Sequence, residues 1–176
     1  MKKLFVGVLC VALSLSVQGK EVNMTSPDGK YQFTLSDSGG QLHYSLTWNG
    51  KQTVKPSLLG INANVEWRDG VEIGTVDSSR KDTIWHPVYG ERSEIKDCYH
   101  AWKIVVNRQN GRDKLILDVR AYDEGIAFRY HFPGGQYLKI TDEYTEYTMP
   151  EGTKAYFTPK AQTPYSYLPL ENWPGE

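Results

Sequence analysis

The sequence predicts an all-β protein built as a sandwich of antiparallel sheets. Apolar residues alternate with polar ones in several segments, and this period of two is typical of strands with one buried face. Turn residues separate these segments at intervals of about ten residues, which favours antiparallel sheets. No apolar stripe with helical spacing runs for three turns. Strands do not alternate with helices either, so neither a barrel enzyme nor a dinucleotide-binding sheet is predicted.

The first strands follow one another closely. Residues 31–35 (YQFTL) and 42–48 (LHYSLTW) alternate between apolar and polar side chains, and a Gly-Gly pair lies between the two segments. Asn49-Gly50 joins the second segment to residues 51–54 (KQTV), and Asn-Gly is the strongest two-residue hairpin signal. These segments therefore predict adjacent antiparallel strands.

A second group of strands is expected farther along the chain. Residues 102–106, 115–121 and 126–132 are rich in apolar residues, with the clearest alternation in the last two segments. Asn110-Gly111 is expected to close a hairpin between the first two of them. Residues 77–82 (DSSRKD) carry no apolar side chain, and we expect them to form a polar, solvated loop.

The composition fits one exported domain. The chain has 176 residues, a formal net charge of -1 and 12% aromatic residues, which argue against a nucleic-acid binder and against disorder. Residues 1–19 have two lysines, an apolar run and small residues near a cut after Gly19, as in an export signal. No apolar stretch of about 18 residues follows, so no membrane span is predicted. Residues 20–176 would form the domain, in which Cys98 is the one cysteine and is expected to be a small buried apolar residue.

No motif for nucleophilic, phosphate-binding or metal chemistry stands out. Residues 85–91 (WHPVYGE) are dense in aromatic side chains and end in an acid. Tyr165, Tyr167, Glu171 and Trp173 form a second such group near the C-terminus. Aromatic rings can stack on the C–H faces of sugars while nearby polar groups bind hydroxyls. The same rings can equally belong to a core, and that alternative stays open.

Four blocks together resemble a known family. Residues 25–29 (TSPDG), 56–60 (PSLLG), 85–91 and 121–130 (AYDEGIAFRY) occur in that order. They look like the N-terminal domain of glycoside hydrolase family 97, which comprises exported α-glucosidases and α-galactosidases of Bacteroides-like bacteria. The resemblance covers residues 22–160. It implies a β-super-sandwich similar to galactose-mutarotase-like domains, and a periplasmic or outer-surface location.

The resemblance also implies how the domain works in the whole enzyme. The sandwich packs on a catalytic (β/α)8 barrel that supplies the acid and the base or nucleophile, so no catalytic residue is expected in this chain. The family uses calcium at the active site, and the N-terminal domain lends one glutamate to it; Glu171 is the nearest acid to the expected position. Trp85, Glu91 and Tyr167 are the residues expected to contact substrate.

The resulting hypothesis is an N-terminal, carbohydrate-associated domain of a calcium-dependent α-glycoside hydrolase, inactive without its barrel. Its expected partners are the barrel of the full-length chain and an oligosaccharide with a terminal α-linked sugar. Two alternatives remain open at this point. One is a stand-alone carbohydrate-binding β-sandwich, and the other is a purely structural module whose aromatic residues form core and interdomain contacts.

Overall fold

The structure is a computed structural model that describes residues 19–109, 111–134, 137–158 and 160–173. The predicted export signal lies outside the described residues, apart from Gly19, and so does Asn110 of the predicted Asn-Gly turn. Within the described parts of the chain, no helix is long and apolar enough to cross a membrane.

The first sheet is antiparallel and has the strand order β1-β2-β3-β4. Its strands are β1 (Glu21–Thr25), β2 (Tyr31–Ser36), β3 (Leu42–Trp48) and β4 (Lys51–Leu59). A short 3-10 helix, η1 (Ser38–Gly40), connects β2 to β3. The predicted strands and their order along the chain are confirmed.

The turn between β3 and β4 shows why the sequence folds in this way. Asn49 and Gly50 have φ values of 50° and 74°, and this left-handed pair matches the twist of the flanking strands. Gly tolerates such values without steric cost, and Asn tolerates them better than most residues. The Asn-Gly pair therefore fixes the register in which Trp48 lies opposite Lys51.

The second sheet has the strand order β10-β9-β8-β7 and is also antiparallel. Its strands are β7 (Val71–Trp85), β8 (Ile95–Arg108), β9 (Lys114–Tyr122) and β10 (Gly125–His131). The prediction of a polar loop at residues 77–82 was wrong, because these residues belong to β7 and pair with β8. Backbone hydrogen bonds hold this part of the strand, while its side chains are exposed and therefore show no apolar alternation.

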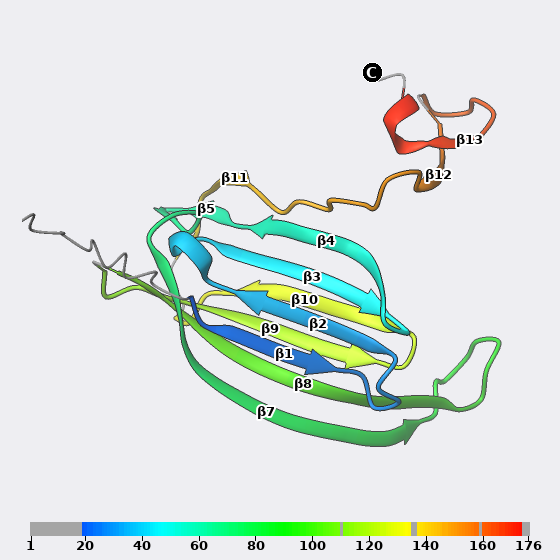
Figure 1. Cartoon of the computed structure of the whole chain (residues 1–176). Coiled ribbons are helices and arrows are strands. Elements are labelled where there is room, and N and C mark those ends of the chain that lie inside the picture. The colour runs from blue at the N-terminus through cyan, green and yellow to red at the C-terminus, as the bar shows by residue number, and fades with distance from the viewer. Residues whose placement is uncertain (1–18, 110, 135–136, 159, 174–176) are drawn as a thin grey trace, which may run out of the picture.

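The remaining elements are short. They are β5 (Ile61–Ala63), β6 (Val65–Glu66), β11 (Ile140–Glu143), β12 (Lys154–Phe157), β13 (Ser166–Pro169) and the 3-10 helix η2 (Leu170–Asn172). β11 pairs with β5, and the chain that follows β11 continues along β4 through backbone hydrogen bonds from Tyr144 to Gly60 and from Glu146 to Leu58. β12 and β13 form a separate two-stranded sheet beyond the sandwich (Figure 1).

The core lies between the two four-stranded sheets. Alternate residues of β9 are fully buried and face alternate residues of β2 and β3. The largest fully buried side chains include Trp67, Phe33, Met24, Leu35, Leu42 and Leu117. Burial of each such side chain stabilises the fold by about 1.5–3 kcal/mol. Cys98 is half-buried rather than buried, so the expectation for its side chain was too strong.

The two sheets are offset from each other. β10 packs against β2 and β3, with its Phe128 ring 6.2 Å from the Phe33 ring and 5.7 Å from the Tyr44 ring. β4 extends beyond β10 on one side, and β7 extends beyond β1 on the other (Figure 1). The offset leaves a groove beneath β4, at the edge of β10.

Candidate functional site

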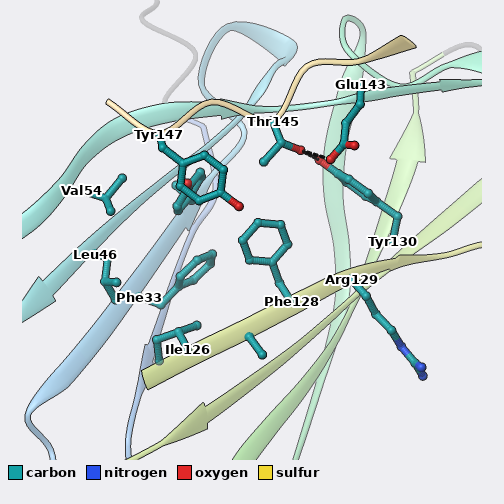
Figure 2. Close-up of a pocket in the computed structure, with 12 residues that line it drawn as sticks. Phe33, Leu46, Val54, Ile126, Phe128, Arg129, Tyr130, Glu143, Thr145 and Tyr147 are labelled. Atoms are coloured by element: carbon teal, nitrogen blue, oxygen red, sulfur yellow. Dashed lines mark hydrogen bonds between the residues drawn. The ribbon is translucent and has the colours of Figure 1, made fainter. Parts of the chain in front are cut away.

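The groove beside β10 has a volume of about 530 Å³. Its walls are aromatic: the ring centres of Phe33 and Tyr44 are stacked 5.3 Å apart, and the Tyr44 and more exposed Tyr147 rings meet edge to face at 6.2 Å. Figure 2 shows Phe128 of β10 pointing into the groove and Arg129 pointing away from it. This difference follows from the alternation of side chains along a strand.

One end of the groove is polar. The hydroxyl groups of Tyr130 and Thr145 lie 3.0 Å apart, and the Thr145 hydroxyl donates to Glu143 Oε1 at 2.8 Å (Figure 2). Burial raises the pKa of the Tyr130 phenol, which is therefore a neutral hydrogen-bonding group near pH 7. Glu143 is the one carboxyl group among the residues that line the groove. Hydrolysis of a glycoside ordinarily needs two carboxyl groups, so the groove does not provide that chemistry.

Trp85 and Glu91 lie at the tip of the β7–β8 hairpin. Trp85 ends β7 and is 50% exposed, and Glu91 follows in an exposed loop whose Val88 and Tyr89 are almost fully exposed. The loop is held by a contact of 3.1 Å between His86 Nδ1 and the Ser93 carbonyl oxygen. The structure therefore keeps Trp85 and Glu91 together on one exposed tip.

Tyr167 and Glu171 lie in a different element, which we call the C-terminal hairpin and which comprises β12, β13 and η2. Tyr167 of β13 stacks on Tyr156 of β12 at 4.4 Å and remains 52% exposed. The ring centres of Phe157 and Trp173 lie 4.3 Å apart, and Glu171 is exposed in η2. Figure 1 places this hairpin apart from the tip of β7 and β8, so the four predicted site residues form two separate pairs.

A metal ion would need more ligands than the C-terminal hairpin offers. Ca²⁺ takes six to eight oxygen ligands, several of them from carboxylates. In the described ranges, no group of three His, Cys, Asp or Glu residues is placed to hold a metal ion. The residues present therefore do not form a complete calcium site, and Glu171 could supply only one ligand of a site built with other residues.

The outer face of the second sheet carries a trough that sequence reasoning missed. It has a volume of about 770 Å³ and includes Ala101 and Ser79 among its lining residues. Arg120 lies over the Tyr99 ring at 4.7 Å. Asp118 accepts a hydrogen bond from Arg129 Nε at 2.9 Å. These residues come from all four strands of the sheet, so only the register brings them together, and no local motif could have shown it.

Comparisons with known proteins place the chain in a family. The family model described as "Glycosyl-hydrolase 97 N-terminal" matches residues 24–175. A retaining α-galactosidase from Bacteroides thetaiotaomicron is 30% identical over 159 residues, which are 88% of this chain and 23% of that protein. The chain thus spans about a quarter of the length of this relative.

Solved structures agree on the fold. A glycoside hydrolase family 97 enzyme from Pseudoalteromonas sp. strain K8, in complex with panose, matches with a TM-score of 0.79 and 22% identity, over 86% of this chain and 25% of that one. A β-arabinopyranosidase matches with a TM-score of 0.72 and 24% identity, over 80% of this chain and 23% of that one. The predicted all-β fold of a family 97 N-terminal domain is thereby confirmed. The chain belongs to the glycosyl-hydrolase 97 family, within the N-terminal domain of that family.

Proposed function

We propose that the chain is the carbohydrate-associated N-terminal domain of a calcium-dependent α-glycoside hydrolase. In this proposal the domain braces a (β/α)8 barrel and lines one wall of the active site. The barrel hydrolyses a terminal α-linked sugar from an oligosaccharide and supplies the acid and the base or nucleophile. The observation that carries the proposal is the C-terminal hairpin, which exposes aromatic rings and an acid beyond the sandwich.

The low stability expected of this hairpin on its own supports a role in contact with another domain. An isolated two-stranded sheet is marginally stable in water. Here Tyr156 is 74% exposed, Tyr165 is 76% exposed, and Leu168 of β13 is 40% exposed. Exposed apolar groups gathered in this way are typical of a surface that another protein part covers. We therefore assign the hairpin to the contact with the barrel.

The same hairpin offers the groups that a sugar site needs. Tyr167 presents an aromatic ring and a hydroxyl group for a sugar, and Lys154 Nζ lies 5.5 Å from the centre of that ring. Glu171 supplies one oxygen ligand to calcium, and the other ligands come from the barrel. Trp85 and Glu91, on the exposed tip of β7 and β8, are proposed as more distant substrate contacts.

The test uses the full-length enzyme and two matched variants. Glu171→Gln removes the proposed ligand, whereas Glu151→Gln removes the same charge from an exposed turn before the hairpin. Calorimetric titration with Ca²⁺ is expected to show affinity weaker by about tenfold or more for Glu171→Gln, because charge count sets calcium affinity, and unchanged affinity for Glu151→Gln. Equal affinities in both variants would refute the assignment of Glu171.

The trough on the outer face of the second sheet favours one alternative, a stand-alone carbohydrate-binding sandwich. Its arginine and aspartate side chains could bind sugar hydroxyl groups without any barrel. Affinity electrophoresis of the 176-residue chain in α-glucan and α-galactan gels separates the two proposals. Retardation that Arg120→Ala abolishes would favour the alternative, and migration equal to that in a gel without polysaccharide would favour the N-terminal domain.

We further propose that the protein is exported to the periplasm or the outer cell surface. The support is the pattern of residues 1–19, with its two lysines and its apolar run. Intact-mass analysis of the protein from the native host is expected to show a product that begins at Lys20. A product that retains residues 1–19 would contradict export by a cleaved signal.

A further inference from the structure

We infer that the open edge of β10 binds one β-strand, supplied by a part of the same protein outside residues 1–176. The strand extends the second sheet beneath β4 and covers the groove. This inference goes beyond the proposed function, because it concerns neither calcium nor the sugar. It rests on the backbone of β10, on the side chains of the groove and on the offset of the sheets.

The backbone of β10 presents unpaired groups on one side. Among the described residues β10 pairs with β9 alone, and a two-residue turn at Asp123-Glu124 closes the hairpin. In such a hairpin, hydrogen-bonded pairs alternate from the residues that flank the turn, here Tyr122 and Gly125. The N–H and C=O groups of Ile126, Phe128 and Tyr130 therefore point to the open edge.

The side chains of the same residues point into the groove. Phe128 lies against Phe33 and Tyr44, and the cover on the far side is thin, since Tyr147 is 63% exposed. Val54 of β4 also lines the groove (Figure 2), and β4 extends beyond β10 (Figure 1). A strand that pairs with β10 would place every second side chain beneath β4, where it would bury apolar surface.

The overhang of β7 beyond β1 differs from that of β4 beyond β10, so the offset of the sheets does not by itself create an aromatic groove. At the other side of the sandwich β7 extends beyond β1, and Ser78 and Arg80 lie on the face of β7 that carries Val76. That face is directed inward, because Val76 pairs with the fully buried Ile104. Its exposed positions Ser78 and Arg80 are polar and need no cover, and the exposed Ile84 of this face lies near the hairpin tip. The groove beside β10, in contrast, is lined with aromatic rings.

The edge of β10 also lacks the features that usually prevent strand addition. Natural edge strands carry proline, lysine, a bulge or an inward-pointing charge. β10 (GIAFRYH) has no proline, no lysine and no bulge, since its register with β9 is regular. Its one arginine, Arg129, points away from the groove and is paired with Asp118 on the outer face. Such an edge is suited to pairing with another strand.

The geometry favours a lone strand over a second copy of the chain. In a second copy β10 is already covered by β2 and β3. If that β10 were added beneath β4, its own first sheet would occupy the space of β4. The Pseudoalteromonas enzyme is about four times as long as the matched region, since the match covers 25% of that chain. A longer protein of this kind contains the additional segment that the edge requires.

The first experiment donates a strand to the full 176-residue chain. A flexible Gly/Ser linker of about 20 residues, which reaches roughly 25 Å, joins Glu176 to a strand of alternating Thr and Val. In the control the valines are replaced by aspartates. We expect amide exchange at Ile126, Phe128 and Tyr130 to slow by about tenfold or more with the valine strand alone. Equal exchange with both strands would overturn the inference.

The second experiment identifies the source of the strand. Hydrogen exchange of a peptide that covers β10 is compared between the 176-residue chain and the full-length enzyme, with sedimentation to record the oligomeric state. We expect slow exchange in the monomeric full-length enzyme and fast exchange in the short chain. Fast exchange in both would overturn the inference, as would protection of the short chain that appears only when it dimerises. Neither result bears on Glu171 or calcium.

Discussion

Tyr44 joins the core to the segment that follows β11, and its replacement gives a graded prediction. Its side chain is 3% exposed, its ring stacks on Phe33 at 5.3 Å, and its hydroxyl donates to the Glu146 carbonyl oxygen at 2.7 Å. Burial raises the pKa of this phenol, so it keeps its proton through the neutral range. The hydroxyl therefore contributes a hydrogen bond at any pH at which the protein would be studied.

Tyr44→Phe removes this donor and keeps the ring. A lost hydrogen bond with a partly buried acceptor costs about 1–2 kcal/mol of the free energy of unfolding. Tyr44→Ala also removes the ring and leaves a cavity, for a total of about 3–5 kcal/mol. Tyr165→Phe, in a side chain that is 76% exposed, is the control and should stay within about 0.5 kcal/mol of the parent.

The assay is urea unfolding followed by circular dichroism on the full chain. The slope of the free energy with urea should be the same in all variants, so that midpoints report stability. If Tyr44→Phe is as stable as Tyr165→Phe, the hydroxyl does not hold the segment. If Tyr44→Phe costs as much as Tyr44→Ala, the ring is not the main contribution to packing.

Three further predictions concern a turn, a bulge and a thiol. Hydrogen bonds from Ser26 and Lys30 hold the pKa of Asp28 well below its usual range, so Asp28→Asn should lower the Tm at pH 7. The difference in Tm between parent and variant should shrink as pH falls below about 4, because Asp28 is then protonated in the unfolded chain. A constant difference down to pH 2 would contradict this. The register of β7 with β8 shifts between Ile73 and Val76, and Gly74 lies in this bulge. Gly74→Ala should cost about 1–3 kcal/mol in urea unfolding, because an added Cβ would lie 2.6 Å from Asn107 Nδ2 and 3.2 Å from the Val105 carbonyl oxygen; unchanged stability would show that the bulge has room. Burial raises the pKa of the Cys98 thiol, so a disulfide reagent at pH 7.5 should modify it more slowly than in the unfolded chain; equal rates would show that the thiol is open.

Most strands could be predicted because their side chains report their surroundings. Residues 115–121 alternate between apolar and polar side chains since one face of β9 meets the first sheet, and the core confirms it. The Asn49-Gly50 turn was predictable because few residues accept left-handed φ values at both positions. Local sequence carries this information whenever burial and turn geometry are decided locally.

Residues 77–82 show where that information ends. Both faces of β7 are exposed there, so its polar side chains look like those of a loop, and only pairing with β8 makes the segment a strand. The groove beside β10 is similar, because it results from the offset of two sheets. The residues that line it come from strands far apart in the chain, and sequence periodicity says nothing of how the sheets are offset.

The predicted sugar contacts came from groups of aromatic residues, whereas the calcium role of Glu171 came from the family resemblance. Tyr167 and Glu171 lie together in the C-terminal hairpin, and Trp85 and Glu91 lie on a different tip. Sequence proximity within each block predicted each pair. Their roles in binding sugar and calcium depend on parts of the protein outside this chain, so they remain predictions that the variants at Glu171 test.

In the proposed function this chain shapes and supports a sugar site but does not itself cleave glycosides. The most direct measurement is hydrolysis of 4-nitrophenyl α-glucoside and α-galactoside by the purified 176-residue chain, with and without Ca²⁺. We expect release of nitrophenol at the rate of buffer alone under both conditions. Turnover that a single carboxyl substitution in this chain abolishes would contradict it.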